Sequence, residues 1–169
     1  QDKSIGFVPT MGALHQGHLS LLKNSLSEND VTVMSIFVNP TQFNNAEDLD
    51  KYPRTLERDV QIMQDLSNNI IVYAPEVADI YEGNTISESF NYDGLENQME
   101  GKHRPGHFDG VGTIVKRLFE IVQPNKAYFG EKDFQQLQIV KKLVSKYKIP
   151  VDVIGCPIHR EANGLAMSS

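Results

Sequence analysis

Short apolar runs alternate with longer amphipathic stretches, and this alternation constrains the fold more than any other feature of the chain. Runs rich in β-branched or aromatic residues predict strands over 5–9, 31–38, 70–74, 127–129 and 151–154. Several are almost continuously apolar, which is typical of strands buried on both faces of a parallel sheet. Between them, apolar residues spaced by three and four predict helices over 17–28, 55–66, 110–122 and 134–147. This order predicts an α/β fold, a parallel sheet with helices on both faces.

The stretch 75–106 is less regular, and we predict an insertion at the sheet edge in which 89–92 is a candidate strand. No repeat or linker divides the 169 residues. We therefore predict one domain over 1–169, and such a length buries roughly 70% of the surface that its unfolded form exposes. Both ends look cut, so we expect this domain to be part of a longer protein.

Composition argues against several classes of protein. The net charge of −6 disfavours a general nucleic-acid surface, which needs clustered Lys and Arg. Cys156 is the only cysteine, so one chain can form neither a disulfide nor a thiolate metal cluster. No run approaches the ~18 apolar residues of a membrane span, and no signal peptide is visible. We predict a cytoplasmic protein that binds neither nucleic acid nor membranes.

Ligands of open parallel sheets bind beyond the carboxyl ends of the strands, so the residues after each strand matter most. After the first predicted strand, His15 and His18 lie three apart at the start of a helix, with Gly17 between them. The helix amino terminus offers free N–H groups to phosphate, and Gly17 allows a ligand close approach. The pattern favours an anion site, although capping or surface histidines are the ordinary alternative. A metal site is less well supported, because no third ligand is evident.

Neutral amides follow the second predicted strand, at Asn39 and Gln42. Amides bind carboxylate, hydroxyl and amine groups without adding charge, which suits a small polar acid beside a triphosphate. A turn formed by Asn39 and Pro40 is the alternative, while Gln42 is harder to explain in that way.

Charged residues follow the fourth predicted strand, where Lys132 and Asp133 precede a helix. Taken alone, Asp133 could be an N-cap and Lys132 a solvated charge. Beside the histidine loop, Lys132 becomes a candidate for neutralising a reacting phosphate, and Asp133 for holding ribose hydroxyls or a magnesium shell. Gln136 would then face the pocket one helical turn further on.

Two glycine-containing segments are less specific. The stretch 101–112 matches neither a Walker loop nor a dinucleotide fingerprint, and it leaves Arg104 and His107 as secondary candidates. The last residues, 159–169, form either ordinary irregular structure or a flap whose serines close over phosphates.

Four sequence blocks together carry a family resemblance: Pro-Thr-Met-Gly-Ala-Leu-His-x-Gly-His, Val-Asn-Pro-x-Gln-Phe, Arg-Pro-Gly-His-Phe-x-Gly-Val and Gly-Glu-Lys-Asp-x-Gln-Gln. In order and spacing, the chain resembles the pantothenate synthetases, also called pantoate–β-alanine ligases. This resemblance implies a Rossmann-like fold of the nucleotidyltransferase type. The ATP-binding residues that it implies are Met11, Gly12, Ala13, Leu14, His15, Gln16, Gly17, His18, Gly130, Glu131, Lys132, Asp133, His159, Met167, Ser168 and Ser169.

The resemblance also implies a reaction and a further set of roles. Pantoate would attack Mg²⁺-bound ATP to give pantoyl-adenylate, and β-alanine would then displace AMP. His18, which can be cationic beside a triphosphate, would act with His15 and Lys132 as catalytic donors. Gln42, Gln136 and Asn39 would bind pantoate, Gln42 would also touch β-alanine, and Asp59 would border the β-alanine or magnesium region.

The family further implies a homodimer and a smaller carboxy-terminal lid domain, which this chain lacks. Three alternatives stay open. The first is another nucleotidyltransferase with a phosphorylated acceptor, the second a fragment that binds nucleotide without turnover, and the third, more remote, a tRNA synthetase fragment.

Overall fold

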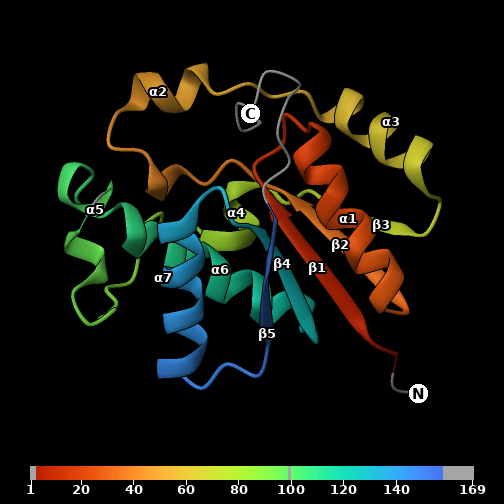
Figure 1. Ribbon diagram of the computed structural model, residues 1–169. Coiled ribbons are helices and arrows are strands. Elements are labelled where there is room, and N and C mark those ends of the chain that lie inside the picture. The colour runs from red at the N-terminus through yellow and green to blue at the C-terminus, as the bar shows by residue number, and fades with distance from the viewer. Residues whose placement is uncertain (1–2, 99, 158–169) are drawn as a thin grey trace.

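A five-stranded parallel sheet forms the centre of the protein, in a computed structural model that describes residues 3–98 and 100–157 (Figure 1). The strands stand in the order β3-β2-β1-β4-β5. They are β1 (Ile5–Thr10), β2 (Val31–Ile36), β3 (Ile70–Tyr73), β4 (Lys126–Gly130) and β5 (Asp152–Cys156). The predicted α/β fold is confirmed, and the strand boundaries differ from the predictions by at most two residues.

Helices cover both faces of this sheet (Figure 1). One face carries α1 (Gln16–Glu28) and α3 (Leu56–Leu66), and the other carries α6 (His107–Val122) and α7 (Phe134–Lys146). The shorter elements are η1 (Pro40–Gln42), α2 (Ala46–Lys51), α4 (Val77–Tyr81), η2 (Leu95–Asn97) and α5 (Glu100–His103). Among the helices within the described residues, none is long and apolar enough to cross a membrane.

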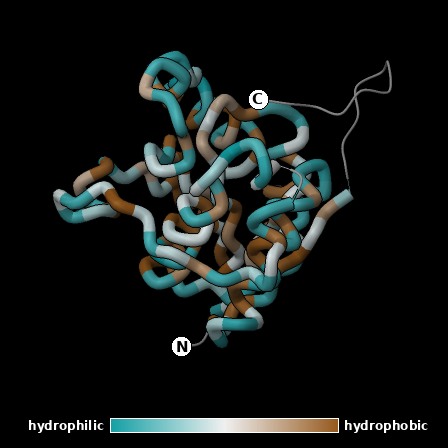
Figure 2. Tube along the Cα trace, turned by 90° about the vertical axis from the view of Figure 1, so that its left-hand side faces the viewer, coloured by the Kyte–Doolittle hydropathy of each residue, from teal (hydrophilic) through white to brown (hydrophobic). Residues whose placement is uncertain are grey.

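Each face of the sheet has its own hydrophobic core, because successive strand residues point to opposite sides. In β1, Phe7 belongs to the cluster under α6 and α7, while Val8 packs with Leu22 of α1 and Met63 of α3. Phe7, Val8 and Leu22 have no exposed surface. Figure 2 shows the hydrophobic stretches gathered inside the molecule, with mostly hydrophilic loops around them.

The candidate strand at 89–92 is wrong, although its side chains alternate as a strand's would. Phe90 and Tyr92 are buried in the core and Asn91 is exposed. The backbone N–H of Phe90 bonds to the Asp109 carboxylate at 3.0 Å, and that of Asn91 to the Tyr147 hydroxyl at 3.1 Å. Asp109 of α6 and Tyr147 at the end of α7 accept hydrogen bonds from these two N–H groups, which are therefore not paired with a neighbouring strand. The segment packs over α6 instead of extending the edge of the sheet.

The sheet opens between β1 and β4 at their carboxyl ends. All six residues of β1 pair with β2, but the pairing with β4 covers only Gly6 with Lys126 and Phe7 with Ala127. Pro9, which has no N–H to donate, lies in the part of β1 beyond this pairing. From β1, the chain continues to β2 and β3 on one side of the sheet, and β4 and β5 lie on the other side of β1. The strand order therefore reverses between β1 and β4, and ligands of such sheets bind at this switch point.

Candidate active site

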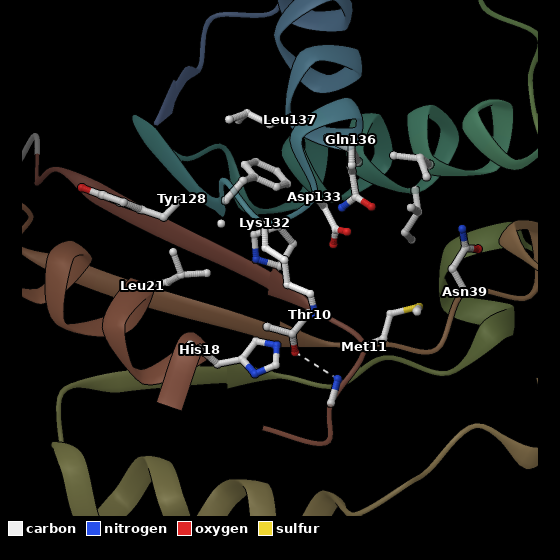
Figure 3. Close-up of a pocket in the computed structure, with 18 of the residues that line it drawn as sticks. Thr10, Met11, His18, Leu21, Asn39, Tyr128, Lys132, Asp133, Gln136 and Leu137 are labelled. Atoms are coloured by element: carbon white, nitrogen blue, oxygen red, sulfur yellow. Dashed lines mark hydrogen bonds between the residues drawn. The ribbon is translucent and has the colours of Figure 1, made fainter. Parts of the chain in front are cut away.

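A pocket of about 250 Å³ lies at this switch point (Figure 3). It is bounded by the carboxyl ends of β1 and β4, the first turns of α1 and α7, and one side of α6. The polar side chains that line it are Thr10, His15, His18, Asn39, Gln42, Tyr52, Tyr128, Lys132, Asp133 and Gln136. Segments more than 100 residues apart in sequence therefore share one cavity.

The loop between β1 and α1 is held by a buried carboxylate. Asp59 of α3 has no exposed surface, and its two oxygens accept hydrogen bonds from the backbone N–H groups of Ala13 and Leu14, each at 3.0 Å. Gly12 and Ala13 both have positive φ, 88° and 53°, which is strained for Ala13. Charge-assisted hydrogen bonds of this kind offset such strain. Asp59 therefore anchors the loop, and its expected place at the border of the β-alanine or magnesium region stays a prediction.

The two histidines form a reciprocal cap at the start of α1. The Gly17 N–H donates to His15 Nδ1 at 3.0 Å, and the His15 N–H donates to His18 Nδ1 at 3.1 Å. The ring centroids are 4.3 Å apart. Because Nδ1 accepts in both rings, each neutral imidazole carries its proton on Nε2. Capping, the ordinary alternative for these histidines, and pocket lining thus occur together.

The pKa of His18 is lowered from 6.5 to about 4, chiefly by burial and then by the neighbouring His15. Lys132 adds to the lowering, and Asp59 opposes it. In the protein without a ligand, a neutral His18 ring therefore faces the pocket. A cationic His18 beside a bound triphosphate stays a prediction. A neutral ring with its proton on Nε2 still donates one hydrogen bond.

The loop from β4 to α7 supplies the opposite wall. Asp133 occupies the N-cap position of α7, but its side chain makes no capping hydrogen bond. In Figure 3, Asp133 and Gln136 point into the pocket above Met11, with Lys132 near His18. Asp133 is thus the N-cap residue considered for it, but its side chain does not cap the helix and lines the pocket.

Asn39 ends the pocket on the side away from His18 (Figure 3), and Gln42, its hydrogen-bond partner, also lines the pocket. Asn39 is 1% exposed, and its Nδ2 donates to Gln42 Oε1 at 2.9 Å and to the Gly110 carbonyl at 3.1 Å. The turn considered as an alternative also exists, as η1. Asn39 thus forms the turn and orients its neighbour at the same time.

Other predicted site residues do not line the pocket. Among the expected ATP-binding residues, Ala13, Leu14, Gln16 and Glu131 are outside the lining, and so are the secondary candidates Arg104 and His107. His107 lies behind the site, with its Nδ1 3.1 Å from the Gln42 carbonyl oxygen. His159, Met167, Ser168 and Ser169 fall outside the described residues.

Several contributors were not found by sequence reasoning, among them Tyr52 and Tyr128 of the lining, Thr10 and Tyr81. Thr10 closes the end of β1, where its Oγ1 donates to the Ser35 carbonyl at 2.9 Å and accepts from the Gly12 N–H at 3.1 Å. Its position at a strand end was a usable signal. Tyr81 contacts Asn39 from α4, and no local pattern indicates this contact.

Comparison with known proteins assigns the chain to a family. The family model described as Pantoate-beta-alanine ligase matches residues 1–169. The chain belongs to the pantoate-beta-alanine ligase family.

Relatives and solved structures agree with this assignment. A pantothenate synthetase of Flavobacterium psychrophilum is 75% identical over 99% of this chain, and one of Christiangramia forsetii is 56% identical over 99%. The pantoate-beta-alanine ligase of Francisella tularensis, in a crystal structure complexed with Beta-gamma ATP and Beta-alanine, matches with a TM-score of 0.93 and 47% identity. That match covers 98% of this chain and 63% of the other. The chain spans about 60% of the length of the two synthetases, 60% and 59% respectively.

The pantoate-beta-alanine ligase motifs are distributed unequally around the pocket. The histidine block, the Asn-Pro-x-Gln block and the Gly-Glu-Lys-Asp block supply all of its polar lining except Tyr52 and Tyr128. The Arg-Pro-Gly-His block lies behind Gln42 and contributes only Val111 to the lining. In this family member the Arg-Pro-Gly-His block therefore supports the site more than it lines it.

Proposed function

We propose that this chain binds ATP and pantoate and forms pantoyl-adenylate, and that the protein to which it belongs condenses the adenylate with β-alanine. One observation carries the proposal. A single pocket joins phosphate-binding donors, His15, His18 and Lys132, to an uncharged end built from Gln42 and Gln136. Such a pocket can hold a carboxylate next to a phosphorus atom, and alignment of this kind supplies much of the rate of a two-substrate reaction.

The donor end fits the triphosphate. The Nε2–H groups of His15 and His18 and the amino terminus of α1 present hydrogen-bond donors, while Lys132 supplies positive charge. Donors fixed before the reaction stabilise charge that develops on phosphate oxygens. The structural role of Asp59 is to keep this loop in place.

The amide end fits pantoate. The side chains of Gln42 and Gln136 would hydrogen-bond its carboxylate and hydroxyl groups, with Gln42 also within reach of β-alanine. Asn39 contributes by holding Gln42. Phe37, Val111 and Leu118 line the same cavity and would contact the branched hydrocarbon part of pantoate.

Magnesium would enter with the nucleotide. Within residues 3–98 and 100–157, no three His, Cys, Asp or Glu side chains gather into a metal site. Mg²⁺ commonly binds through substrate phosphates, water and one or two carboxylates. Asp133 in the pocket lining is a suitable carboxylate, so the donor set fits an ion that ATP brings.

The proposed reaction has two balanced steps. A pantoate carboxylate oxygen forms a bond to the α-phosphorus of ATP, and the bond from that phosphorus to the bridging oxygen of pyrophosphate breaks. The amine of β-alanine then attacks the acyl carbon, loses a proton, and AMP leaves with the former carboxylate oxygen. The protein needs no covalent intermediate, because its side chains bind, orient and donate hydrogen bonds.

A nucleotidyltransferase with a phosphorylated acceptor is less well supported. Such a substrate would need Lys or Arg beside Asn39 and Gln42. Among the described residues that line the pocket, the only Lys or Arg is Lys132, which lies at the donor end. Pyrophosphate release should therefore require pantoate, and a phosphorylated acceptor should not replace it.

Calorimetric titration with Mg-ATP, with and without pantoate, followed by mass spectrometry for pantoyl-adenylate, tests the proposal. Adenylate that forms only with pantoate is the expected result, and His18→Ala should reduce its formation far more than it weakens ATP binding. Equal losses would contradict the role of His18. ATP binding without adenylate would favour a domain that only binds nucleotide, and release of pyrophosphate with a phosphorylated acceptor would favour the rival enzyme.

The homodimer stays a prediction that rests on the family resemblance, and the cytoplasmic location stays one that rests on cysteine content and sequence pattern. Sedimentation velocity of the purified protein would test the first, and cell fractionation the second.

A further inference from the structure

We propose that Tyr81 is a positioning residue, which acts through Asn39 to fix the amide of Gln42 with its N–H groups toward the acid substrate. The inference rests on the proposed function, because it concerns how the same pocket recognises its acid. Tyr81 does not line the pocket, and it reaches Gln42 only through a directed chain of hydrogen bonds.

The direction of this chain is set by a backbone carbonyl. The Gly110 carbonyl can only accept, so the Asn39 atom 3.1 Å from it is Nδ2. The second hydrogen of Nδ2 points to the Gln42 side chain at 2.9 Å, and an N–H can be received there only by Oε1. The Nε2 of Gln42 is therefore the other atom of its amide, available to a ligand in the pocket.

Tyr81 completes the other half of the Asn39 amide. With Nδ2 fixed by Gly110, Oδ1 is the acceptor, and the Tyr81 hydroxyl donates to it. Thr41 Oγ1 lies 3.2 Å from Asn39 Oδ1 and 2.9 Å from the Tyr81 hydroxyl, so it contacts both partners of this hydrogen bond. All hydrogen-bonding positions of Asn39 that face the protein are thus occupied, and its amide cannot flip without losing several bonds.

Tyr81 is itself held in place. It is 3% exposed, and the Arg117 guanidinium lies 4.9 Å from its ring centroid. Arg117 Nη1 donates to the Ile80 carbonyl at 3.0 Å, which fixes the guanidinium against α4. Burial raises the pKa of Tyr81, so the hydroxyl keeps the proton that it donates. We call this chain of contacts, from Arg117 and Tyr81 through Asn39 to Gln42, the relay. It connects α6 and α4 to the substrate end of the pocket.

A fixed Gln42 amide has a consequence for specificity. Nε2 can only donate, so Gln42 selects an acceptor such as a carboxylate or hydroxyl oxygen. Were the amide free to flip, Gln42 could also accept from an amine or amide ligand. The structure thus assigns Tyr81 a role in the preference for an acid, at a distance from the reacting atoms.

Tyr81→Phe tests the relay, because it removes the hydroxyl and keeps the ring against Arg117. The matched control is Tyr92→Phe, since Tyr92 is also buried and its hydroxyl donates to the Phe108 carbonyl at 2.9 Å, away from the pocket. We expect Tyr81→Phe to weaken pantoate binding roughly fivefold at unchanged ATP affinity. Tyr92→Phe should cost similar stability and leave both affinities unchanged. Equal effects of the two variants on pantoate binding would overturn the proposal.

A double-mutant cycle tests whether Tyr81 acts through Gln42. In a Gln42→Ala background, Tyr81→Phe should cause no further loss of pantoate binding. A loss as large as in the unsubstituted protein would show an independent effect and would contradict the relay.

Side-chain amide signals in ¹⁵N NMR spectra separate failure of the relay from failure of the proposed function, because they need no ligand. Tyr81→Phe should shift the amide signals of both Asn39 and Gln42, and Tyr92→Phe should shift neither. If the unsubstituted protein fails to bind pantoate while these shifts occur, the proposed substrate is wrong and the relay stands. If the shifts are absent, the relay is wrong.

Discussion

His18 is held by a backbone hydrogen bond that also determines which of its nitrogens carries the proton. Its Nδ1 accepts from the His15 N–H, so protonation of the ring would break this bond as well as place a charge in a buried site. A neutral donor is the result. In phosphate binding, a neutral His18 would supply a hydrogen bond of fixed direction, while Lys132 would supply positive charge.

The lowered pKa of His18 predicts how stability depends on pH. The folded state keeps this ring neutral down to about pH 4, whereas an unfolded chain takes up the proton near 6.5. Between these values the unfolded state binds more protons, so the free energy of unfolding should fall as the pH is lowered from 6.5 to 4. Denaturant unfolding across this pH range should show the decrease in the free energy of unfolding, and the decrease should be smaller in His18→Gln. An identical slope in the variant would contradict the assigned environment.

Asp59→Asn should weaken the hydrogen bonds that hold the loop between β1 and α1. An amide offers one acceptor where the carboxylate offers two, so either Ala13 or Leu14 loses its partner. We expect about 1–3 kcal/mol less stability and weaker ATP binding, measured by urea unfolding and calorimetry. Asp65→Asn is the control, because Asp65 is exposed on the same helix and accepts a hydrogen bond from Gln61, away from the loop. Comparable losses in both variants would argue against the anchoring role.

Elements meet closely where α6 passes behind η1. A Cβ added to Gly110 would lie 2.5 Å from the Thr41 carbonyl oxygen and 3.0 Å from the Gln42 nitrogen. Backbone atoms cannot move aside as a flexible side chain can. The position of the acid-binding end of the pocket therefore depends on the absence of a side chain from one turn of α6.

Gly110→Ala should accordingly weaken pantoate binding as well as stability. Overpacking of this kind costs about 1–3 kcal/mol, and the shift of η1 would displace Gln42. Gly112→Ala provides the comparison, since its Cβ would meet Tyr92 and Phe90, away from the pocket. Both variants should lose stability in thermal unfolding, and only Gly110→Ala should lose pantoate affinity. Retained affinity in Gly110→Ala would show that η1 tolerates the shift.

The whole molecule is organised around one sheet with a core on each face. Leu22 of α1 and Leu143 of α7 belong to different cores, and neither has exposed surface. Because both cores include side chains of the same strands, loss of either should destabilise the entire domain.

Leu22→Ala and Leu143→Ala should each lower the free energy of unfolding by about 2–5 kcal/mol. The double variant should show nearly the sum, because the sites lie on opposite faces. Circular dichroism and intrinsic tyrosine fluorescence should report one coincident transition in every variant. Two separated transitions would show that the faces unfold independently.

The sequence by itself determined the layers of the fold and the loops of the site. Apolar runs and three-and-four spacing located each strand and each long helix, because burial on both faces of a sheet leaves a local signature. The histidine loop and Lys132 were likewise predicted as parts of one site, because both follow strands of a parallel sheet, although capping and solvation can explain each residue taken alone. The segment 89–92 misled for a related reason. Its side chains alternate like those of a strand, but side chains from elsewhere take its N–H groups.

Only the tertiary structure decided how these parts act together. Sequence order cannot show that β1 lies beside β4, and this adjacency brings the histidine loop to Lys132 and opens the pocket. The neutral state of His18 and the relay from Tyr81 to Gln42 are equally hidden from local patterns. Both depend on burial and on hydrogen bonds between residues distant in sequence, and these are fixed only when the sheet and its two helical layers have packed.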